Sequence, residues 1–296
     1  MNWISLLSMP YWIAASGILG LLVGSFLNVV ILRLPARLQH GWQREAKAIL
    51  AEASGMAETP AEADIDAPPG IVLEPSHCPN CKHPLAARDN IPVLSWLLLR
   101  GHCRYCKSPI SPQYPLVEAL TALLSAIVMA HFGPTLQGAA ALLFTWVLVA
   151  ASGIDLRTQL LPDQLTQPLL WLGLLLSLAP LWVSPASAIL GATLGYLSLW
   201  SVYWAFRLLT GKEGMGYGDF KLLAALGAWM GTGALLPIVL ISSIVGAVVG
   251  SAYLWLSRKG HGVPIPFGPY LATAGWIWLL AGHALTHWYL GYFLHG

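Results

Sequence analysis

Long stretches without a charged residue recur along this chain. Residues 1–32 contain no Asp, Glu, Lys or Arg, and further charge-free runs cover 119–154, 164–206, 222–257 and 260–296. A helix that crosses a bilayer needs about 20 mostly apolar residues. Charged residues make up only 9% of the chain, whereas soluble domains have about 25%. The sequence therefore predicts an all-α polytopic membrane protein.

Turn-forming residues divide three of these runs into two spans each. They are Gly133-Pro134, Pro180 with Pro185, and residues 231–233 (GTG). The pattern predicts about eight transmembrane helices. Their expected positions are 10–32, 113–132, 136–154, 164–180, 186–207, 219–231, 235–257 and 267–289.

The basic residues lie on one side of this arrangement. With eight spans, the segments 33–112, 155–163, 208–218 and 258–266 share a side, and fourteen of the fifteen Lys and Arg residues lie within them or one position outside. Lys221, at the entrance of the sixth span, is on the same side. Cytoplasmic loops are rich in Lys and Arg, so this side is predicted to be cytoplasmic and both termini periplasmic. The N-terminus lacks the basic leading region of a cleaved signal peptide.

All four cysteines lie in the one sizeable polar block, residues 33–112. Cys78 and Cys81 form one Cys-x-x-Cys pair, and Cys103 and Cys106 form the second, with 21 residues between the pairs. This spacing is typical of a structural zinc site with four thiolate ligands. Disulfides or redox dithiols are the alternative, which a cytoplasmic position disfavours. Residues 48–70, rich in Ala, Glu and Pro, are predicted to be a flexible connector.

Acidic residues are scarce after residue 118, where only Asp155, Asp163, Glu213 and Asp219 occur. An ionisable residue at membrane depth indicates a functional site by default. Asp155 ends the third predicted span and Asp219 begins the sixth, so both lie at the cytoplasmic boundary. Two carboxylates at close range hold one proton between them and provide a general base and a general acid around one water. This is the chemistry of aspartyl peptide hydrolysis.

Each of these aspartates, taken alone, also fits a purely structural role. Asp219 alone fits an N-cap of the sixth span, and Asp155 alone fits an ion pair with Arg157 or a helix end. Asp163 follows a proline and is predicted to cap the fourth span, while Glu213 is expected to lie in a solvated loop.

Gly216 and Gly218, beside Asp219, are predicted to leave the backbone open to a substrate. No strand precedes this glycine-rich segment, so it is not interpreted as a nucleotide-binding loop. We expect membrane lipid as a partner and no nucleic acid.

Several segments, taken in order, carry a resemblance. They are 24–29 (GSFLNV), 33–35 (RLP), the two Cys-x-x-Cys pairs, 89–96 (DNIPVLSW), 114–118 (YPLVE), Asp155 with 161–163 (LPD), and 216–221 (GYGDFK). Together they resemble the type IV prepilin peptidases of bacteria, and the last segment also resembles the Gly-x-Gly-Asp motif of presenilin-type proteases. The match covers nearly the whole chain.

The resemblance implies two activities at the bacterial inner membrane. The first is cleavage of the basic leader from type IV prepilins and type II secretion pseudopilins after a glycine. The second is N-methylation of the new terminal residue, usually Phe, from S-adenosylmethionine. The resemblance also implies a catalytic dyad and a structural zinc site, but it names no residues for the methyl donor. The dyad is Asp155 and Asp219, and the zinc ligands are Cys78, Cys81, Cys103 and Cys106.

The expected organisation has three parts. Residues 1–32 form the first transmembrane helix, residues 33–112 form a small cytoplasmic zinc-binding insert associated with methyl transfer, and residues 113–296 form a seven-helix membrane domain that carries the protease site.

Two other functions stay open on the residues alone. A transporter or channel with an intramembrane aspartate relay would favour carboxylates near mid-span. A membrane thiol oxidoreductase would favour cysteines near the outer face.

Overall fold

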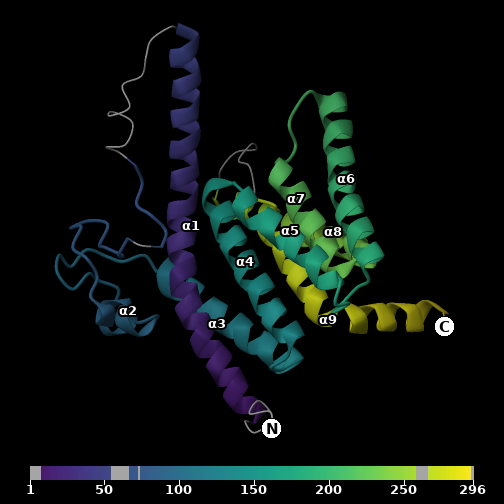
Figure 1. Cartoon of the computed structure of the whole chain (residues 1–296), viewed down its shortest axis with the longest axis horizontal. Helices are drawn as coiled ribbons and strands as arrows, with labels where there is room; N and C mark the ends of the chain where they lie inside the picture. The colour runs from purple at the N-terminus through teal and green to yellow at the C-terminus, as the bar shows by residue number, and fades with distance from the viewer. Residues whose placement is uncertain (1–7, 55–66, 73, 258–265, 295–296) are drawn as a thin grey trace. The chain divides into compact units, whose positions relative to one another are not determined.

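A computed structural model of the chain describes residues 8–54, 67–72, 74–257 and 266–294. Within these ranges the secondary structure is helical apart from two isolated bridges, His77 with Pro84 and His102 with Pro109. The chain divides into two units, Ile13–Ala126 and Met1–Trp12 together with Ile127–Gly296. Figure 1 labels the helices of both.

The first unit holds most of two long helices and the polar block between them. Its elements are α1 (Met9–Ser54), the 3-10 turn η2 (Ala87–Asn90), α2 (Leu94–Leu98) and α3 (Gln113–Phe132). The backbones of α1 and α3 approach closely, since a Cβ on Gly20 would lie 2.8 Å from Cα of Ala122 and one on Gly24 would lie 2.7 Å from Cα of Glu118. Small residues permit such crossings between helices in a membrane.

Helix α1 extends well past the predicted end of the first span. It continues through Pro35 to Ser54, so residues 33–54, expected in the cytoplasmic insert, prolong the first helix. Residues 36–54 are rich in Ala, Leu, Glu, Lys and Arg, which favour helix. The predicted connector at 48–70 is therefore wrong for 48–54. Residues 55–66 lie outside the described residues, and 67–70 are non-helical.

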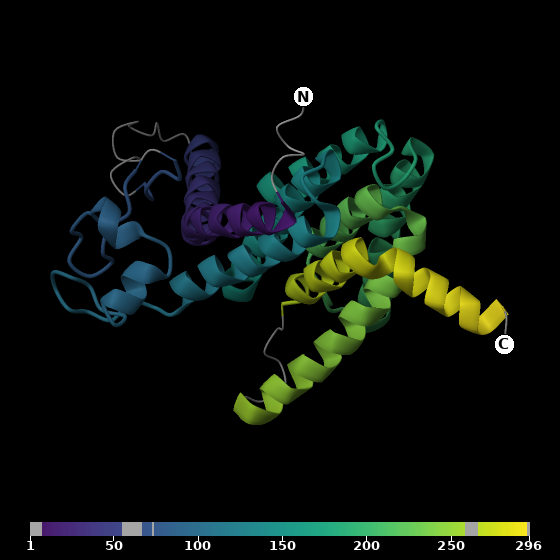
Figure 2. The same ribbon diagram turned by 90° about the horizontal axis from the view of Figure 1, so that it is seen from below.

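Over its described residues, the second unit is a bundle of six helices. They are α4 (Leu136–Thr158), α5 (Asp163–Ser177), α6 (Pro185–Thr210), α7 (Tyr217–Met230), α8 (Thr232–Ser257) and α9 (Gly268–Leu294). Helix α7 contacts α5, α6, α8 and α9, and Figures 1 and 2 show it enclosed among its neighbours. Every residue from 222 to 229 is buried. The core of this unit therefore follows α7.

Two contacts fix α7 within the bundle. A Cβ on Gly191 of α6 would lie 2.2 Å from the carbonyl oxygen of Gly227, so these helices cross at a point where only glycine fits. The indole Nε1 of Trp229 donates to the carbonyl of Leu169 in α5 at 2.8 Å. This bond satisfies a buried donor and joins α7 to α5.

The predicted all-α membrane fold is confirmed, with a helix at each of the eight expected positions. Five helices in the described ranges, α1, α3, α4, α6 and α8, are long and apolar enough to cross a bilayer. Helix α5 has 15 residues and α7 has 14, fewer than the roughly 20 that a full crossing requires. The short sixth span that the sequence predicts is α7.

Candidate functional site

Asp155 lies in the last turn of α4 and is buried, with 4% of its surface exposed. Its Oδ2 accepts a hydrogen bond from the backbone N–H of Gly268 at 2.9 Å. Gly268 is the first residue of α9, 113 positions further along the chain. A Cβ on Gly268 would lie 2.7 Å from the same Oδ2, so the approach requires glycine. Gly268 was not among the residues predicted from the sequence, although 266–269 (PFGP) marks the start of the last span.

Asp219 lies in the first turn of α7 and is 7% exposed. Its carboxylate accepts a hydrogen bond from the backbone N–H of Gly216 and interacts electrostatically with Asp155. Its Oδ1 is buried and has no hydrogen-bond partner among the described residues. The N-cap of α7 is Gly216, so the interpretation of Asp219 as the cap residue is wrong.

The two glycines before Asp219 have different surroundings. Beside Gly216, the nearest atom to an added Cβ would be a backbone nitrogen of the same segment at 4.0 Å, whereas a Cβ on Gly218 would lie 2.6 Å from Cβ of Leu161. The predicted open backbone therefore holds at Gly216 and is wrong at Gly218. Gly218 instead lets the segment before α5 pass close to the start of α7, and Leu161 also lies next to Gly268.

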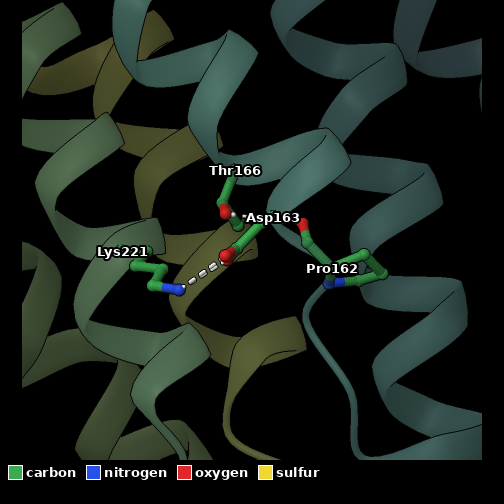
Figure 3. Close-up of polar contacts among 4 residues, drawn as sticks. All are labelled: Pro162, Asp163, Thr166 and Lys221. Atoms are coloured by element: carbon green, nitrogen blue, oxygen red, sulfur yellow. Dashed lines mark hydrogen bonds and ion pairs between the residues drawn. The ribbon is translucent and has the colours of Figure 1, made fainter. Parts of the chain in front are cut away.

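Asp163 does not cap α5. Pro162 occupies the N-cap position with an extended backbone and Asp163 is the first helical residue; the fixed φ of proline, about −65°, suits the position just before a helix. The Asp163 carboxylate instead accepts two hydrogen bonds from Nζ of Lys221, at 2.6 and 2.8 Å. Figure 3 shows this pair joining α5 to α7, with the Thr166 hydroxyl directed back to Pro162.

The four cysteines of the first unit form one cluster. Their sulfur atoms all lie within 4.8 Å of one another, and the Sγ atoms of Cys78 and Cys106 are 3.8 Å apart. A tetrahedral ion with metal–sulfur bonds of about 2.3 Å separates its ligand sulfurs by about 3.8 Å. Hydrogen bonds from the side chain and backbone of Ser108 lower the pKa of the Cys106 thiol to about 6, which favours the thiolate that binds metal. The predicted clustering of the four cysteines is therefore confirmed, and their spacing suits a bound metal ion.

An internal repeat, which the sequence analysis missed, builds this cluster. Residues 77–84 (HCPNCKHP) and 102–109 (HCRYCKSP) share the pattern His-Cys-x-x-Cys-Lys-x-Pro. In each copy the lysine has a positive φ, 59° at Lys82 and 58° at Lys107. In each copy the lysine N–H also donates to the carbonyl of the first cysteine, at 2.9 and 3.1 Å. The two copies therefore fold into matching turns that supply two sulfurs each.

Comparison with known proteins shows the family to which the chain belongs. A family model described as the bacterial peptidase A24 N-terminal domain matches residues 18–132, and one for the type IV leader peptidase family matches residues 142–251. The chain is 56% identical over 275 residues to the prepilin leader peptidase/N-methyltransferase of Aeromonas hydrophila, covering 93% of this chain and 92% of that one. The chain belongs to the prepilin leader peptidase/N-methyltransferase family. The first match contains the tetracysteine cluster and the second contains both aspartates.

Other members of this family are similarly close. The Xanthomonas campestris pv. campestris protein is 56% identical over 277 residues, 94% of this chain and 93% of that one. The Pseudomonas aeruginosa protein is 54% identical over 273 residues, 92% and 91% of the two chains. Both carry the same name, and no solved structure matches the chain. These relatives are enzymes, which favours the peptidase interpretation over a transporter or a thiol oxidoreductase.

Proposed function

We propose that this membrane enzyme cleaves the basic leader from type IV prepilins and type II secretion pseudopilins after a glycine. We also propose that it methylates the new terminal amine, usually that of Phe. The activities named for relatives over more than nine-tenths of the chain support both steps. The observation that carries the peptidase assignment is the burial of both Asp155 and Asp219, with Asp219 subject to the charge of Asp155 and its Oδ1 without a partner among the described residues.

The surroundings of the two carboxylates support different roles. The N–H of Gly268 stabilises a negative charge on Asp155, because a hydrogen bond to the ionised form favours that form. The Asp219 carboxylate also accepts one backbone N–H, from Gly216, but its Oδ1 is buried without a hydrogen-bond partner among the described residues, and an unpaired buried charge is unfavourable. The shared proton is therefore assigned to Asp219, which makes Asp155 the general base and Asp219 the general acid.

The reaction follows from these roles. Asp155 takes a proton from a water molecule while the water oxygen attacks the carbonyl carbon of the scissile glycine, and Asp219 gives its proton to the carbonyl oxygen. The resulting diol then breaks the carbon–nitrogen bond. The leaving amine receives the proton held by Asp155, and Asp219 recovers a proton from a diol hydroxyl. One water is consumed, and the pair returns to its starting state.

The tetracysteine cluster is proposed to hold a structural Zn²⁺. Four thiolates at the spacing of Cys78 and Cys106 suit this soft, tetrahedral ion. Metal binding of this kind contributes folding free energy to small polar segments. The methyl group for the second activity is proposed to come from S-adenosylmethionine.

The enzyme is proposed to lie in the bacterial inner membrane, with residues 33–112 in the cytoplasm and both termini in the periplasm. The distribution of Lys and Arg supports this orientation. Residues 33–112 are assigned to methyl transfer and residues 113–296 to peptide cleavage.

Incubation of the purified enzyme with a prepilin tests both activities together. Mass analysis of the product is expected to show loss of the leader without S-adenosylmethionine. When S-adenosylmethionine is present, the product should also gain about 14 Da, because a methyl group replaces a hydrogen. An uncut prepilin would contradict the peptidase assignment. A cut product without added mass would contradict the methyltransferase assignment alone.

A further inference from the structure

A cavity of about 460 Å³ lies within the first unit. Its walls come from α1, both cysteine turns, α2 and the start of α3. Segments 24–29, 89–96 and 114–118, which the aspartate pair does not use, all contribute to it. Its size falls in the range of about 300–1,000 Å³ that is typical of small-molecule sites.

Asn28 presents an unpaired acceptor in this cavity. The residue is 1% exposed, and its Nδ2 donates to the carbonyls of Gly24 at 3.3 Å and Tyr114 at 3.0 Å. Two carbonyl partners fix the orientation of the amide, because only the nitrogen can donate to them. Its Oδ1 is buried without a hydrogen-bond partner among the described residues. Buried polar atoms are nearly always paired, so this oxygen indicates a missing donor.

Asp89 presents a second unpaired acceptor in the same cavity. The residue is 8% exposed, and its Oδ1 accepts from Arg104 at 2.6 and 2.8 Å. This pairing lowers the pKa of the Asp89 carboxyl, so the group is ionised at neutral pH. Its Oδ2 is buried and has no partner among the described residues. The cavity therefore holds an anionic oxygen that none of the described side chains satisfies.

Glu118 adds a second carboxylate. The residue is 7% exposed; its Oε2 accepts from the backbone N–H of Val93 at 2.7 Å, and the Ser25 hydroxyl also bonds to it. Val93 has φ 60°, a strained conformation for a β-branched residue. Strained backbone of this kind gathers at ligand sites.

Each Lys and Arg residue that lines the cavity is either already hydrogen-bonded to another group or exposed. Arg33 donates to the carbonyls of Gly70, Glu74 and Pro75, and Arg104 is held by Asp89. Lys82 is exposed. The cavity therefore lacks hydrogen-bond donors and positive charge to pair with its buried oxygens.

Aromatic rings complete the cavity. Trp96, Tyr105 and Tyr114 line it, and the indole of Trp96 is fixed by a hydrogen bond to the carbonyl of Ile110 at 3.1 Å. Planar rings stack on aromatic side chains, and cations bind over their faces. A ligand that fits would combine amine and hydroxyl donors, a positive charge and a planar ring.

We infer that this cavity binds S-adenosylmethionine, through Asn28, Asp89 and Glu118. The inference rests on the proposed methyltransferase activity and locates it. The α-ammonium, the ribose hydroxyls and the adenine amine of this molecule supply the donors that Asn28 Oδ1 and Asp89 Oδ2 lack, and its ammonium and sulfonium supply positive charge beside the carboxyl groups of Asp89 and Glu118. The buried cysteines Cys78 and Cys103 also line the cavity, so the metal cluster forms part of its wall.

The test measures binding directly on the full-length enzyme in detergent. Calorimetric titration with S-adenosylmethionine compares wild type with Asp89→Asn and Glu118→Gln, which keep side-chain shape but remove charge. A hydrogen bond to a charged group is typically worth enough to change affinity about tenfold or more, so each variant is expected to bind at least about tenfold more weakly. Glu45→Gln, an exposed acid on α1, is the matched control and should bind as wild type does.

Unchanged affinity in Asp89→Asn and Glu118→Gln would overturn the cavity assignment. Leader cleavage by the same preparations reports whether each variant is folded. If a variant loses both cleavage and binding, photo-crosslinking of labelled S-adenosylmethionine to the wild-type enzyme decides. Label on peptides from 25–33 or 76–118 supports the site, and label confined to 127–296 contradicts it. A wild type that neither binds nor methylates would instead contradict the proposed methyltransferase activity.

Discussion

The backbone N–H of Gly268 donates to Oδ2 of Asp155 at 2.9 Å, across 113 positions of sequence. This bond places the start of α9 against the last turn of α4 and fixes one oxygen of the proposed general base. A Cβ at position 268 would lie 2.7 Å from that oxygen. A larger residue than glycine at this position would therefore displace the Asp155 carboxylate.

Substitution of Gly268 is expected to impair cleavage by moving Asp155. A displacement of about 1 Å at a catalytic group costs about 100-fold in rate, so Gly268→Ala should lower kcat for leader cleavage by about that factor. Gly233→Ala is the control, since a Cβ there meets no atom within 4 Å. Rates come from gel-shift assays with purified prepilin. A Gly268→Ala enzyme with a wild-type kcat would show that the contact does not position the base.

Replacement of either aspartate of the pair is expected to abolish leader cleavage. Asn keeps the shape of Asp but cannot take or return a proton, and general acid–base catalysis alone is worth about 10²–10⁴-fold. Residues that act as a unit are not additive, so the double variant Asp155→Asn with Asp219→Asn should be no slower than either single variant. Cleavage is followed in membranes, with expression checked by blotting.

Asp163→Asn is the matched control for that pair. Its ion pair with Lys221 is half exposed, and exposed pairs contribute at most about 1 kcal/mol, so the variant should keep substantial activity. Near wild-type cleavage by Asp219→Asn would disprove the dyad. A dead Asp163→Asn beside an active Asp155→Asn would move the first catalytic position to Asp163.

Zinc is expected at about one ion per chain in enzyme purified without chelator. Cys78→Ser and Cys103→Ser replace buried ligands and should lose the metal and methyl transfer, because the cluster forms part of the cavity wall. Elemental analysis and thiol titration measure the ion and the sulfurs it protects. Asp155→Asn should keep its zinc. Metal-free wild-type protein with four freely reactive thiols would refute the site.

The proposed topology predicts opposite labelling of two engineered cysteines. A cysteine at position 57, outside the described residues, should react with an impermeant maleimide only after the membrane is permeabilised. A cysteine in place of Ala179, an exposed residue between α5 and α6, should react in intact cells. The reverse pattern would overturn the orientation drawn from Lys and Arg.

The features that could be predicted from the sequence depend on local pattern. Charge-free runs located eight helices, because hydropathy and length alone decide whether a segment suits a bilayer. The spacing of the four cysteines predicted the metal cluster, because each Cys-x-x-Cys turn is a local structure. Asp155 and Asp219 stood out as acids at the ends of apolar spans. The continuation of α1 beyond the predicted span, to Ser54, was not foreseen, because residues 33–54 are polar yet favour helix.

Tertiary structure decided which residues meet. In lipid, hydropathy does not distinguish a helix face that packs on protein from one that faces the bilayer, so the neighbours of α7 and the contact between Gly268 and Asp155 could not be predicted. The same holds for the oxygens of Asn28 and Asp89 that lack a partner among the described residues. Whether an acceptor is unpaired can be known only after every nearby donor has been placed in space. By itself, the sequence determined the spans, the cysteine cluster and the candidate acids. Only packing between distant segments decided the donor to the base and the shape of the cavity, because both depend on backbone approach over a few ångströms.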